Sequence, residues 1–376
     1  MFQVLLSLIF IRPFISSFAF PYLNSLYSAF FLIFLASWVI IKKPALKKIS
    51  FLKYPLILFC LALTISIIFS SDKLNSLGEL YKYISGLLLF LIAASLEYED
   101  KIKVIHAMII TGLVISVLAI YQYFFGFQHI LDYISKQKLP DASFALDYIS
   151  RKRVFSPFVT PNTLAGYLAM IIPLTLTHKN KIWLIMLLSS ALLLTKSLGA
   201  LISLVLALGL YFYLQGRLEK RRIIILLFGL AVVGLLFIIR SMTYMQHLQP
   251  IFSATMRLNY WKDTLEIIRA SPITGVGIGN FNLTHSRYAH NSYLQIWAEM
   301  GILGIASILW LILTIFKSAI ENINVSPNKR LMTGLLAANA VFLIHNLVDF
   351  SFFLPEVSLI WWVIFGLAIY FSNFSK

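Results

Sequence analysis

His290 places a titratable imidazole between a glycine-rich segment and a long apolar run. The segment before it reads TGVGIGNF (274–281), in which Gly275 and Gly277 allow the backbone to turn sharply and approach a ligand closely. An imidazole beside such a flexible loop can act as a base near neutral pH. Asn291 follows directly and opens the apolar run with it. The alternative is a boundary histidine that is simply bonded to a carbonyl.

Two acids add to this chemistry. Glu299 lies well inside an apolar run, where an acid is either functional or paired with a neighbouring helix. His345 and Asp349 are four residues apart, which predicts one helix face, so the acid could orient a histidine or bind a hydroxyl. Solvation of a helix end is the alternative. Gly301 and Gly304 are one turn apart, and we expect them to let another helix approach closely.

A set of cations stands near the ends of apolar runs on the same predicted side: Lys82, Arg151, Lys152, Arg153, Lys196, Arg240 and Arg257. The planar fork of arginine donates two parallel hydrogen bonds, which suits a diphosphate. Together these cations favour an anionic ligand, whereas any one of them could belong to a solvated face. No Asp-x-Asp motif or acidic cluster with metal-binding spacing lies on the predicted outer side, and the sequence has no P-loop or G-x-S-x-G motif, so we expect chemistry without metal, cofactor or ATP.

The elements that position these residues are membrane helices. Hydrophobic residues make up 60% of the chain and charged residues 12%, whereas a soluble domain is roughly a quarter charged. Apolar runs recur at the length that a membrane helix needs. They predict one all-α membrane domain (1–376) of about twelve spans: 2–20, 22–41, 54–70, 76–95, 103–125, 161–178, 181–195, 198–214, 222–240, 290–316, 331–350 and 355–373. Arg12-Pro13 interrupts the first of these, so a broken or interfacial helix is the alternative for 2–20.

The basic residues set the predicted orientation. Alternate short connectors are rich in Lys and Arg, which marks their side as cytoplasmic and puts both termini there. The net charge of +16 therefore indicates topology and contact with anionic lipid rather than nucleic acid. Two long loops, 126–160 and 241–289, fall on the outer side. Within the second, residues 254–271 carry apolar side chains at helical spacing, which predicts an amphipathic helix at the outer interface or packed on the spans.

These motifs together resemble the O-antigen ligase/O-antigen polymerase superfamily of bacterial envelope enzymes. The ligase pattern of His, Asn/Ser/Gln, nine residues and Gly-x-x-Gly is similar to His290-Asn291 followed by Gly301 and Gly304. Four further parts of the chain look like family motifs: Arg257 with Trp261, SPITGVGIGNF (271–281), Pro161-Asn162 with Ala165-Gly166, and His345 with Asp349. One departure is Leu198, which occupies a position where members often carry arginine; Lys196 lies two residues away.

The resemblance implies a membrane glycosyltransferase of the bacterial inner membrane. Its donor would be a glycan (the O-antigen) on undecaprenyl diphosphate, and its acceptor a lipid A–core or other glycan hydroxyl at the periplasmic face. His290 would take the acceptor's proton, Arg257 would stabilise the departing diphosphate, and Asp349 would orient the base or the acceptor. The residues expected to bind substrate are Lys196, Arg153, Arg240, Lys82, Asn162, Asn291, His345, Gly275 and Gly277.

Other functions stay open at this point. A repeat-unit polymerase or a protein O-oligosaccharyltransferase would use the same donor with another acceptor. A transporter or flippase for a lipid-linked glycan belongs to a different class, and it would carry polar residues through the midplane of several spans. In this sequence the polar residues collect at one end of the spans, with Glu299 as the main exception.

Overall fold

The computed structural model describes residues 1–43, 46–137, 143–178, 181–216, 219–242, 250–324, 326 and 328–369. All named elements in these ranges are helices, accompanied by an isolated bridge between Leu283 and Ser286. Six helices of the described part are long and apolar enough to cross a membrane: Pro21–Lys42, Ile49–Ile68, Lys73–Ser95, Tyr98–Lys136, Lys220–Ile239 and Ser292–Glu321. Four shorter apolar helices accompany them. The chain is thus a multi-pass, all-helical membrane protein, and the count of twelve spans stays a prediction.

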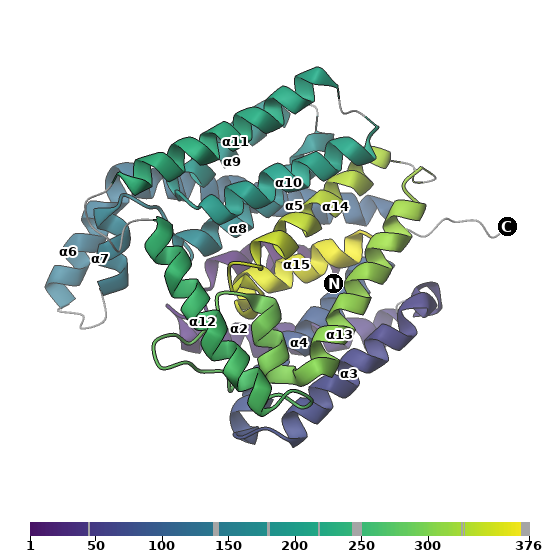
Figure 1. Ribbon diagram of the computed structural model, residues 1–376. Coiled ribbons are helices and arrows are strands. Elements are labelled where there is room, and N and C mark those ends of the chain that lie inside the picture. Colours follow the sequence, from purple (N-terminus) through teal and green to yellow (C-terminus); the bar gives the residue numbers. More distant parts are fainter. Residues whose placement is uncertain are drawn as a thin grey trace. The chain divides into compact units, whose positions relative to one another are not determined.

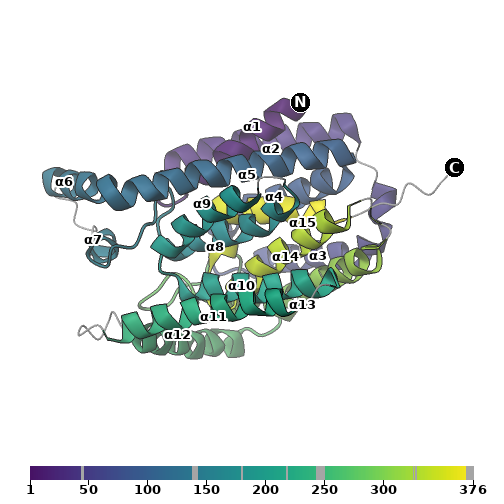
Figure 2. The ribbon, with the colours of Figure 1, turned by 90° about the horizontal axis from the view of Figure 1, so that it is seen from above.

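The chain divides into two compact units. The first unit comprises Met1–Ser25, Tyr98–Leu236 and Ala337–His345. Its helices are α1 (Phe2–Ile11), α5 (Tyr98–Tyr121), α6 (Phe127–Gln137), α7 (Ser143–Ser150), α8 (Pro161–Ile171), α9 (Lys181–Leu194) and α10 (Leu198–Leu214). Helix α5 packs against α1 and α9, beside which it runs in Figure 2, and α8 packs against α9 and α10. The predicted first outer loop (126–160) contains α6 and α7.

The second unit comprises Leu26–Glu97, Phe237–Leu336 and Asn346–Lys376. Its helices are α3 (Lys53–Ile68), α4 (Lys73–Ser95), α12 (Pro250–Ala270), α13 (Ser292–Glu321) and α15 (Pro355–Leu367). Helix α13 packs against α3 and α12, as Figure 1 shows, and α15 packs against α4. The remaining long helices, α2 (Pro21–Lys42), α11 (Lys220–Ser241) and α14 (Lys329–His345), are divided between the units.

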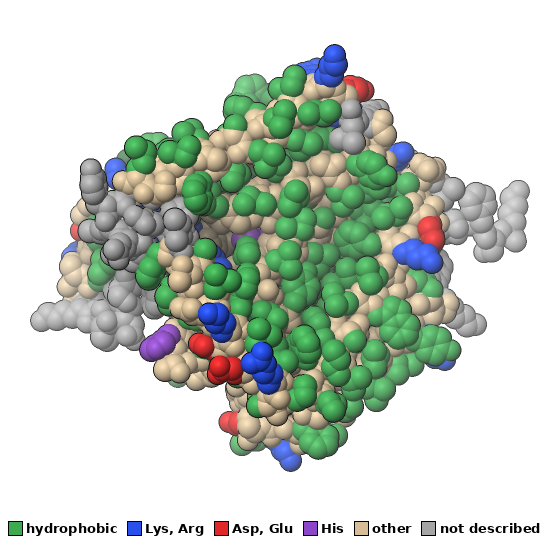
Figure 3. All heavy atoms as spheres, in the orientation of Figure 1, with side chains coloured by type: hydrophobic (Ala, Val, Ile, Leu, Met, Phe, Trp, Pro, Cys, Tyr) green, Lys and Arg blue, Asp and Glu red, His purple; other side chains and the backbone are tan. Residues whose placement is uncertain are grey.

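The surface of the second unit suits a lipid environment. Large apolar side chains are exposed along α3 and α13, including Leu61, Ile302, Trp310 and Leu313, the last with 68% of its surface accessible. Figure 3 shows hydrophobic side chains over these helices and charged side chains gathered along α12. A continuous exposed apolar surface on a soluble protein would be an aggregation hazard, whereas in lipid it is the favoured arrangement.

Three predicted spans differ from the helices observed. The run 2–20 breaks after Ile11 into a 3-10 turn at Arg12–Phe14, where Pro13 removes a helical donor. The run 161–178 becomes a 3-10 helix at Ile172–Thr177. The predicted span 290–316 corresponds to α13 (Ser292–Glu321), one of the six candidate spans, but the backbone leaves helical geometry at Gly301 inside this helix.

A helix is present over the predicted residues 254–271, as α12, whereas the outer loop that was predicted to hold it stays a prediction. Tyr260 and Trp261 are partly buried and Ile268 is 4% exposed, so this face leans on the protein, whereas Leu265 faces outward at 38% exposure. The packing of α12 on α13 supports the alternative of a helix held by the bundle. Its position at a membrane interface stays a prediction.

Candidate functional site

The glycine-rich segment before His290 is bonded into the break in α13. At Gly301 the backbone has φ 66° and ψ −169°, a conformation that only glycine adopts without strain. A Cβ atom there would overlap the carbonyl group of Ile273. Three backbone hydrogen bonds join the segment to the break: Val276 N–H to the Ala298 carbonyl (2.9 Å), Gly277 N–H to the Glu299 carbonyl (3.0 Å) and Ile302 N–H to the Pro272 carbonyl (2.9 Å). The loop thus replaces helical hydrogen bonds that α13 lacks.

Side chains fix the same loop from three directions. The carboxylate of Glu299 accepts the Gly279 N–H at 3.0 Å. Ser66 of α3 donates to the Glu299 carbonyl and accepts the Ile278 N–H. Asn75 of α4 donates to the Gly279 carbonyl at 2.8 Å. These bonds hold the backbone of the loop between α3, α4 and α13.

Gly275 and Gly277 have the conformation that the sequence predicts for sharp turns, with φ of 71° and 102°. A Cβ atom on Gly275 would overlap the backbone of Glu299, and one on Gly277 would overlap Ser70. Both glycines are thus required by close packing of the loop on the protein itself. Their expected contact with substrate stays a prediction.

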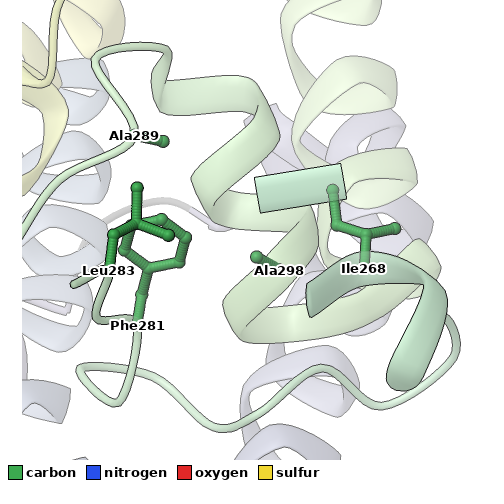
Figure 4. Close-up of a cluster of buried hydrophobic side chains, with 5 residues drawn as sticks. All are labelled: Ile268, Phe281, Leu283, Ala289 and Ala298. Atoms are coloured by element: carbon green, nitrogen blue, oxygen red, sulfur yellow. The ribbon is translucent and has the colours of Figure 1, made fainter. Parts of the chain in front are cut away.

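A buried apolar cluster seats the chain just before His290. Figure 4 shows Phe281, Leu283 and Ala289 of the loop grouped with Ile268 of α12 and Ala298 of α13. All five are at most 7% exposed. Burying these side chains gives the loop a fixed position relative to both helices, because apolar burial stabilises by about 25 cal/mol per Å². The residue that follows Ala289 is therefore delivered to a defined place.

His290 itself is held between two aromatic rings. Its ring stacks on Tyr260 of α12 with centroids 5.5 Å apart, and meets the ring of Phe350 edge-on at 4.8 Å. Its backbone is in the left-handed region, with φ 52°, which is uncommon for a residue with a side chain. The Nδ1 atom is buried and has no hydrogen-bond partner among the described residues. Strain and an unused ring nitrogen together are typical of a functional position.

Arg257 and Asp349 lie within electrostatic reach of His290. Burial lowers the pKa of His290 to about 4, with Asp349 opposing this shift and Arg257 adding to it. Burial also lowers the pKa of Arg257, again opposed by Asp349, although a guanidinium stays charged at neutral pH. One η-nitrogen of Arg257 donates to Ser253 at 2.9 Å, and its ε-nitrogen is buried without a partner in the described part of the chain. The three residues predicted to be catalytic thus form one group.

The start of α13 is tied to the segment that carries Asp349. Asn291 caps the helix, since its side-chain oxygen accepts the N–H groups of Tyr293 and Leu294 at 3.0 and 3.1 Å. Ser292 donates from its hydroxyl to Asn346 at 2.6 Å and to the Asp349 carbonyl at 3.2 Å. The Asp349 carboxylate in turn accepts a short hydrogen bond from Ser351. The bonds of Ser292 hold the start of α13 against the segment that carries Asp349. The capping bonds give Asn291 a structural role, and its contact with substrate stays a prediction.

Gln295 links the buried acid to the residue before the base. Its amide nitrogen donates to Glu299 at 2.9 Å, and its amide oxygen accepts the Ala289 N–H at 3.1 Å. Glu299 therefore fixes the orientation of the amide, and the amide fixes the backbone next to His290. The side-chain hydrogen bonds of Glu299 run to the glycine-rich loop and to its own helix, and not to a neighbouring helix of the described chain.

A small polar cavity opens beside this network in the second unit. Its volume is about 30 Å³, and its lining includes Lys82 together with Tyr288, Gln295 and Glu299. Lys82 forms a short ion pair with Glu79 and donates to the Phe353 carbonyl at 3.3 Å. Tyr288 stacks on Phe350 at 4.2 Å, the same ring that His290 meets. Lys82, predicted as a substrate ligand, thus belongs to a cavity next to the His290 group.

Three other predicted ligands meet in the first unit. Arg153 is 7% exposed and donates to the Asn162 side chain at 2.9 Å and to the Thr195 carbonyl at 2.8 Å. The imidazole of His345 lies 3.3 Å from the Asn162 carbonyl through Nε2. Gly166 makes room for that ring, because a Cβ atom there would lie 2.6 Å from its Cδ2. The Pro-Asn-x-x-Ala-Gly segment therefore forms one hydrogen-bonded group with an arginine and a histidine.

Lys196 stands near this group at the entry to α10. Its backbone is left-handed (φ 54°), and its ammonium group donates to the Arg151 carbonyl at 2.8 Å. Arg151 itself pairs with Asp147 at 2.7 Å. Leu198 is the first residue of α10. It stands at the position where members of the O-antigen ligase/polymerase superfamily often carry arginine. The cation nearest in sequence is thus the lysine.

The prediction that His345 and Asp349 share one helix face is wrong. Helix α14 ends at His345, so Asp349 lies in the irregular segment that follows. Each residue has its own partners, His345 in the first unit and Asp349 in the second. The side chain of Arg240, another predicted ligand, lies outside the described residues.

Several residues of the His290 group escaped the sequence prediction. Tyr260 and Phe350 flank the imidazole and Tyr288 stacks on Phe350, and nothing in the sequence distinguishes these aromatic residues among 49 Phe and Tyr residues. Gln295 carried a signal, since it stands four residues after Asn291 and four before Glu299. That spacing puts the amide and the acid on one helix face.

The sequence of the site also matches a known family. Residues 183–309, about a third of the chain, match the family model described as O-antigen ligase. This stretch includes Lys196, Arg257 and His290, and it confirms the resemblance to the O-antigen ligase/polymerase superfamily. The match and the apolar helices indicate a membrane glycosyltransferase of the ligase or polymerase type, related to lipopolysaccharide. A comparison with curated proteins gave no match for this chain.

Proposed function

We propose that this protein transfers a glycan, the O-antigen, from undecaprenyl diphosphate to a hydroxyl of lipid A–core at the periplasmic face of the inner membrane. The observation that carries the proposal is the environment of His290: a strained, aromatic-walled imidazole with an unused buried nitrogen, beside Arg257 and Asp349. The family match over 183–309 supports the class of reaction. The pattern His290-Asn291, nine residues, Gly301-x-x-Gly304 supports the ligase over the polymerase.

His290 is the general base of the proposed reaction. Its lowered pKa of about 4 keeps the imidazole neutral at physiological pH, and the neutral form is the one that can accept a proton. The acceptor hydroxyl gives its proton to the imidazole while its oxygen bonds to the anomeric carbon of the donor glycan. Asp349 then stabilises the imidazolium that forms, since its negative charge already favours that form.

Arg257 stabilises the leaving group. As the bond between the anomeric carbon and the diphosphate oxygen breaks, the electron pair stays on the undecaprenyl diphosphate and its charge grows. A half-buried guanidinium with a buried, unpartnered ε-nitrogen is suited to that charge, because fixed donors in a site of low dielectric are worth several kcal/mol. In the first unit, the group of Arg153, Asn162 and His345, with Lys196, is proposed separately as a site for anionic substrate oxygens.

The test is a transfer assay with purified protein, a lipid-linked glycan and lipid A–core. We expect His290→Gln to lose about 10²–10⁴-fold in kcat, the range for a general base. His285→Gln is the matched control, since His285 is an exposed histidine of the same loop. Equal loss in both variants, or none in His290→Gln, would remove the proposed base.

The acceptor decides between the members of the family. Glycan transferred to lipid A–core supports the ligase, whereas transfer only to another lipid-linked repeat unit makes the protein a polymerase, and transfer to a protein hydroxyl an oligosaccharyltransferase. Movement of the intact lipid-linked glycan across vesicles without bond formation would instead support the transporter.

A further inference from the structure

The cavity beside the His290 group contains a buried hydroxyl that the protein leaves unbonded. Tyr83 of α4 lines the cavity and is 5% exposed, and its hydroxyl has no hydrogen-bond partner among the described residues. Glu79 and Glu299 line the same cavity as Tyr83. A buried hydroxyl without a partner costs about 1–3 kcal/mol. A ligand that bonds it would recover that free energy.

The lining of the cavity suits an uncharged, hydroxyl-bearing group. The lining holds two acidic side chains, Glu79 and Glu299, and two basic ones, Lys82 and Arg287, and Lys82 is already paired with Glu79, so this lysine is not free to hold an anion. Carboxylates accept hydrogen bonds, ammonium and guanidinium groups donate them, and a hydroxyl does both. Aromatic side chains of Phe352, Phe353 and Trp362 form the rest of the wall. Polar groups placed among aromatic walls are the usual composition of a small-molecule site.

The cavity also lies next to the proposed base. Tyr288, two residues before His290, lines it and stacks on the Phe350 ring that the imidazole meets. Gln295, another lining residue, accepts the N–H of Ala289. A group bound in the cavity would therefore lie near His290, separated from it by Tyr288 and the Phe350 ring on one side and by the Gln295–Ala289 hydrogen bond on the other.

We propose that this cavity is a subsite for a hydroxyl or hydroxymethyl group of the acceptor glycan, bonded by the Tyr83 hydroxyl. The inference rests on the proposed transfer reaction and names where its acceptor is recognised. The acceptor is the better occupant because the donor carries a diphosphate, which needs unbalanced positive charge. Arg257, proposed to serve the diphosphate, does not line the cavity.

The size of the cavity limits what enters it. A volume of about 30 Å³ holds one small polar group rather than a whole sugar ring. The ring itself would rest at the mouth, where Tyr288 is partly exposed and Arg287 is exposed. A single structural water is the competing occupant, since a cavity of this size with polar partners can hold one.

The first experiment measures equilibrium binding of lipid A–core to the full-length protein in nanodiscs, with no donor present. We expect Tyr83→Phe, which removes only the hydroxyl, to weaken binding about 3- to 10-fold, the worth of one hydrogen bond. Tyr167→Phe is the matched control: Tyr167 is also buried and its hydroxyl also lacks a partner in the described chain, but it does not line the cavity. Binding by Tyr83→Phe equal to that of wild type would overturn the subsite and leave a bound water as the occupant.

The second experiment couples protein and ligand in the transfer assay. A panel of monodeoxy acceptors should contain one that wild type uses 3- to 10-fold less well and that Tyr83→Phe uses as well as the parent acceptor. The KM for the lipid-linked donor should not change in Tyr83→Phe. Additive losses across the whole panel, or a raised donor KM, would overturn the inference. Lipid A–core that binds in a Tyr83-dependent way without being glycosylated would overturn the proposed function and leave the binding site standing.

Discussion

Replacing Gly301 by alanine should separate the two explanations of the Gly-x-x-Gly pattern. The sequence suggested that Gly301 and Gly304 let another helix approach. In the structure Gly301 instead breaks α13 and faces the carbonyl of Ile273, with φ 66° and ψ −169°. We expect Gly301→Ala to be strongly destabilising, because the new Cβ atom cannot be accommodated in that backbone conformation.

The size of the effect follows from two contributions. Holding a residue with a side chain in this region costs about 1–3 kcal/mol. If the Ile273 carbonyl moves aside, the three backbone hydrogen bonds between the loop and the break are also at risk, at about 1 kcal/mol each. The free energy of unfolding should thus fall by about 1 kcal/mol at least and about 6 kcal/mol at most. Activity should fall with it, since the displaced loop leads to His290.

The assay is the free energy of unfolding in mixed micelles titrated with SDS, together with glycan transfer at a temperature where the variant is folded. Gly78→Ala is the matched control, because Gly78 lies in α4 with nothing within 4 Å of a new Cβ atom. It should be neutral or stabilising by up to about 1 kcal/mol, as expected for alanine in place of glycine in a helix. If Gly301→Ala is as stable as Gly78→Ala, the assigned role of the break is refuted.

Three further predictions concern the Asn291 cap, the protonation of His290 and the guanidinium of Arg257. Asn291→Ala should lower the free energy of unfolding by about 1 kcal/mol, whereas Asn291→Ser should keep both stability and transfer; loss of transfer in a stable Asn291→Ser would show that the amide binds substrate instead. Because burial lowers the pKa of His290 to about 4, kcat/KM should stay level from pH 7 to about 5 and fall near pH 4, and an acidic limb centred at 6.5 would contradict a buried base. The unfolded state binds this proton more tightly, so the unfolding free energy should fall as the pH drops from about 6.5 to 4, and it should fall less in His290→Gln. Arg257→Lys keeps the charge but loses the planar fork, and we expect a loss of about 10²-fold in kcat; unchanged kcat would remove Arg257 from the diphosphate.

Much of the helical architecture could be predicted from the sequence, because an apolar run in lipid has few alternatives to a helix. Several predicted spans correspond to single helices, for example 198–214, which coincides with α10. The breaks were harder to find. Pro13 marks one of them, whereas Gly301 looked like a packing glycine, since only its contact with Ile273, 28 positions earlier in the chain, demands a left-handed backbone.

Likewise, only some residues of the candidate site could be predicted from the sequence. His290 could be selected by its residue type and position, whereas Arg257 was singled out among seven cations only by the family resemblance; both lie within electrostatic reach of Asp349. The pairing of His345 with Asp349 failed, because helical spacing was assumed past the last residue of α14. Tyr83 could not be found at all. A tyrosine in an apolar run is ordinary, and its unbonded hydroxyl follows only from the packing of α4, α13 and the loop around one cavity.

The hydrogen bonds between the glycine-rich loop and the break in α13 also constrain biogenesis. Backbone groups left open at a helix break are costly in lipid, so α13 cannot settle in the bilayer before partners are present. The groups that bond to the break are synthesised earlier than Gly301: they belong to Pro272, Val276 and Gly277 on the loop and to Ser66 on α3. The hydrogen-bonding partners are therefore already synthesised when the break at Gly301 leaves the ribosome. A circular permutant that placed α13 ahead of its loop would have to insert the broken helix with those groups exposed.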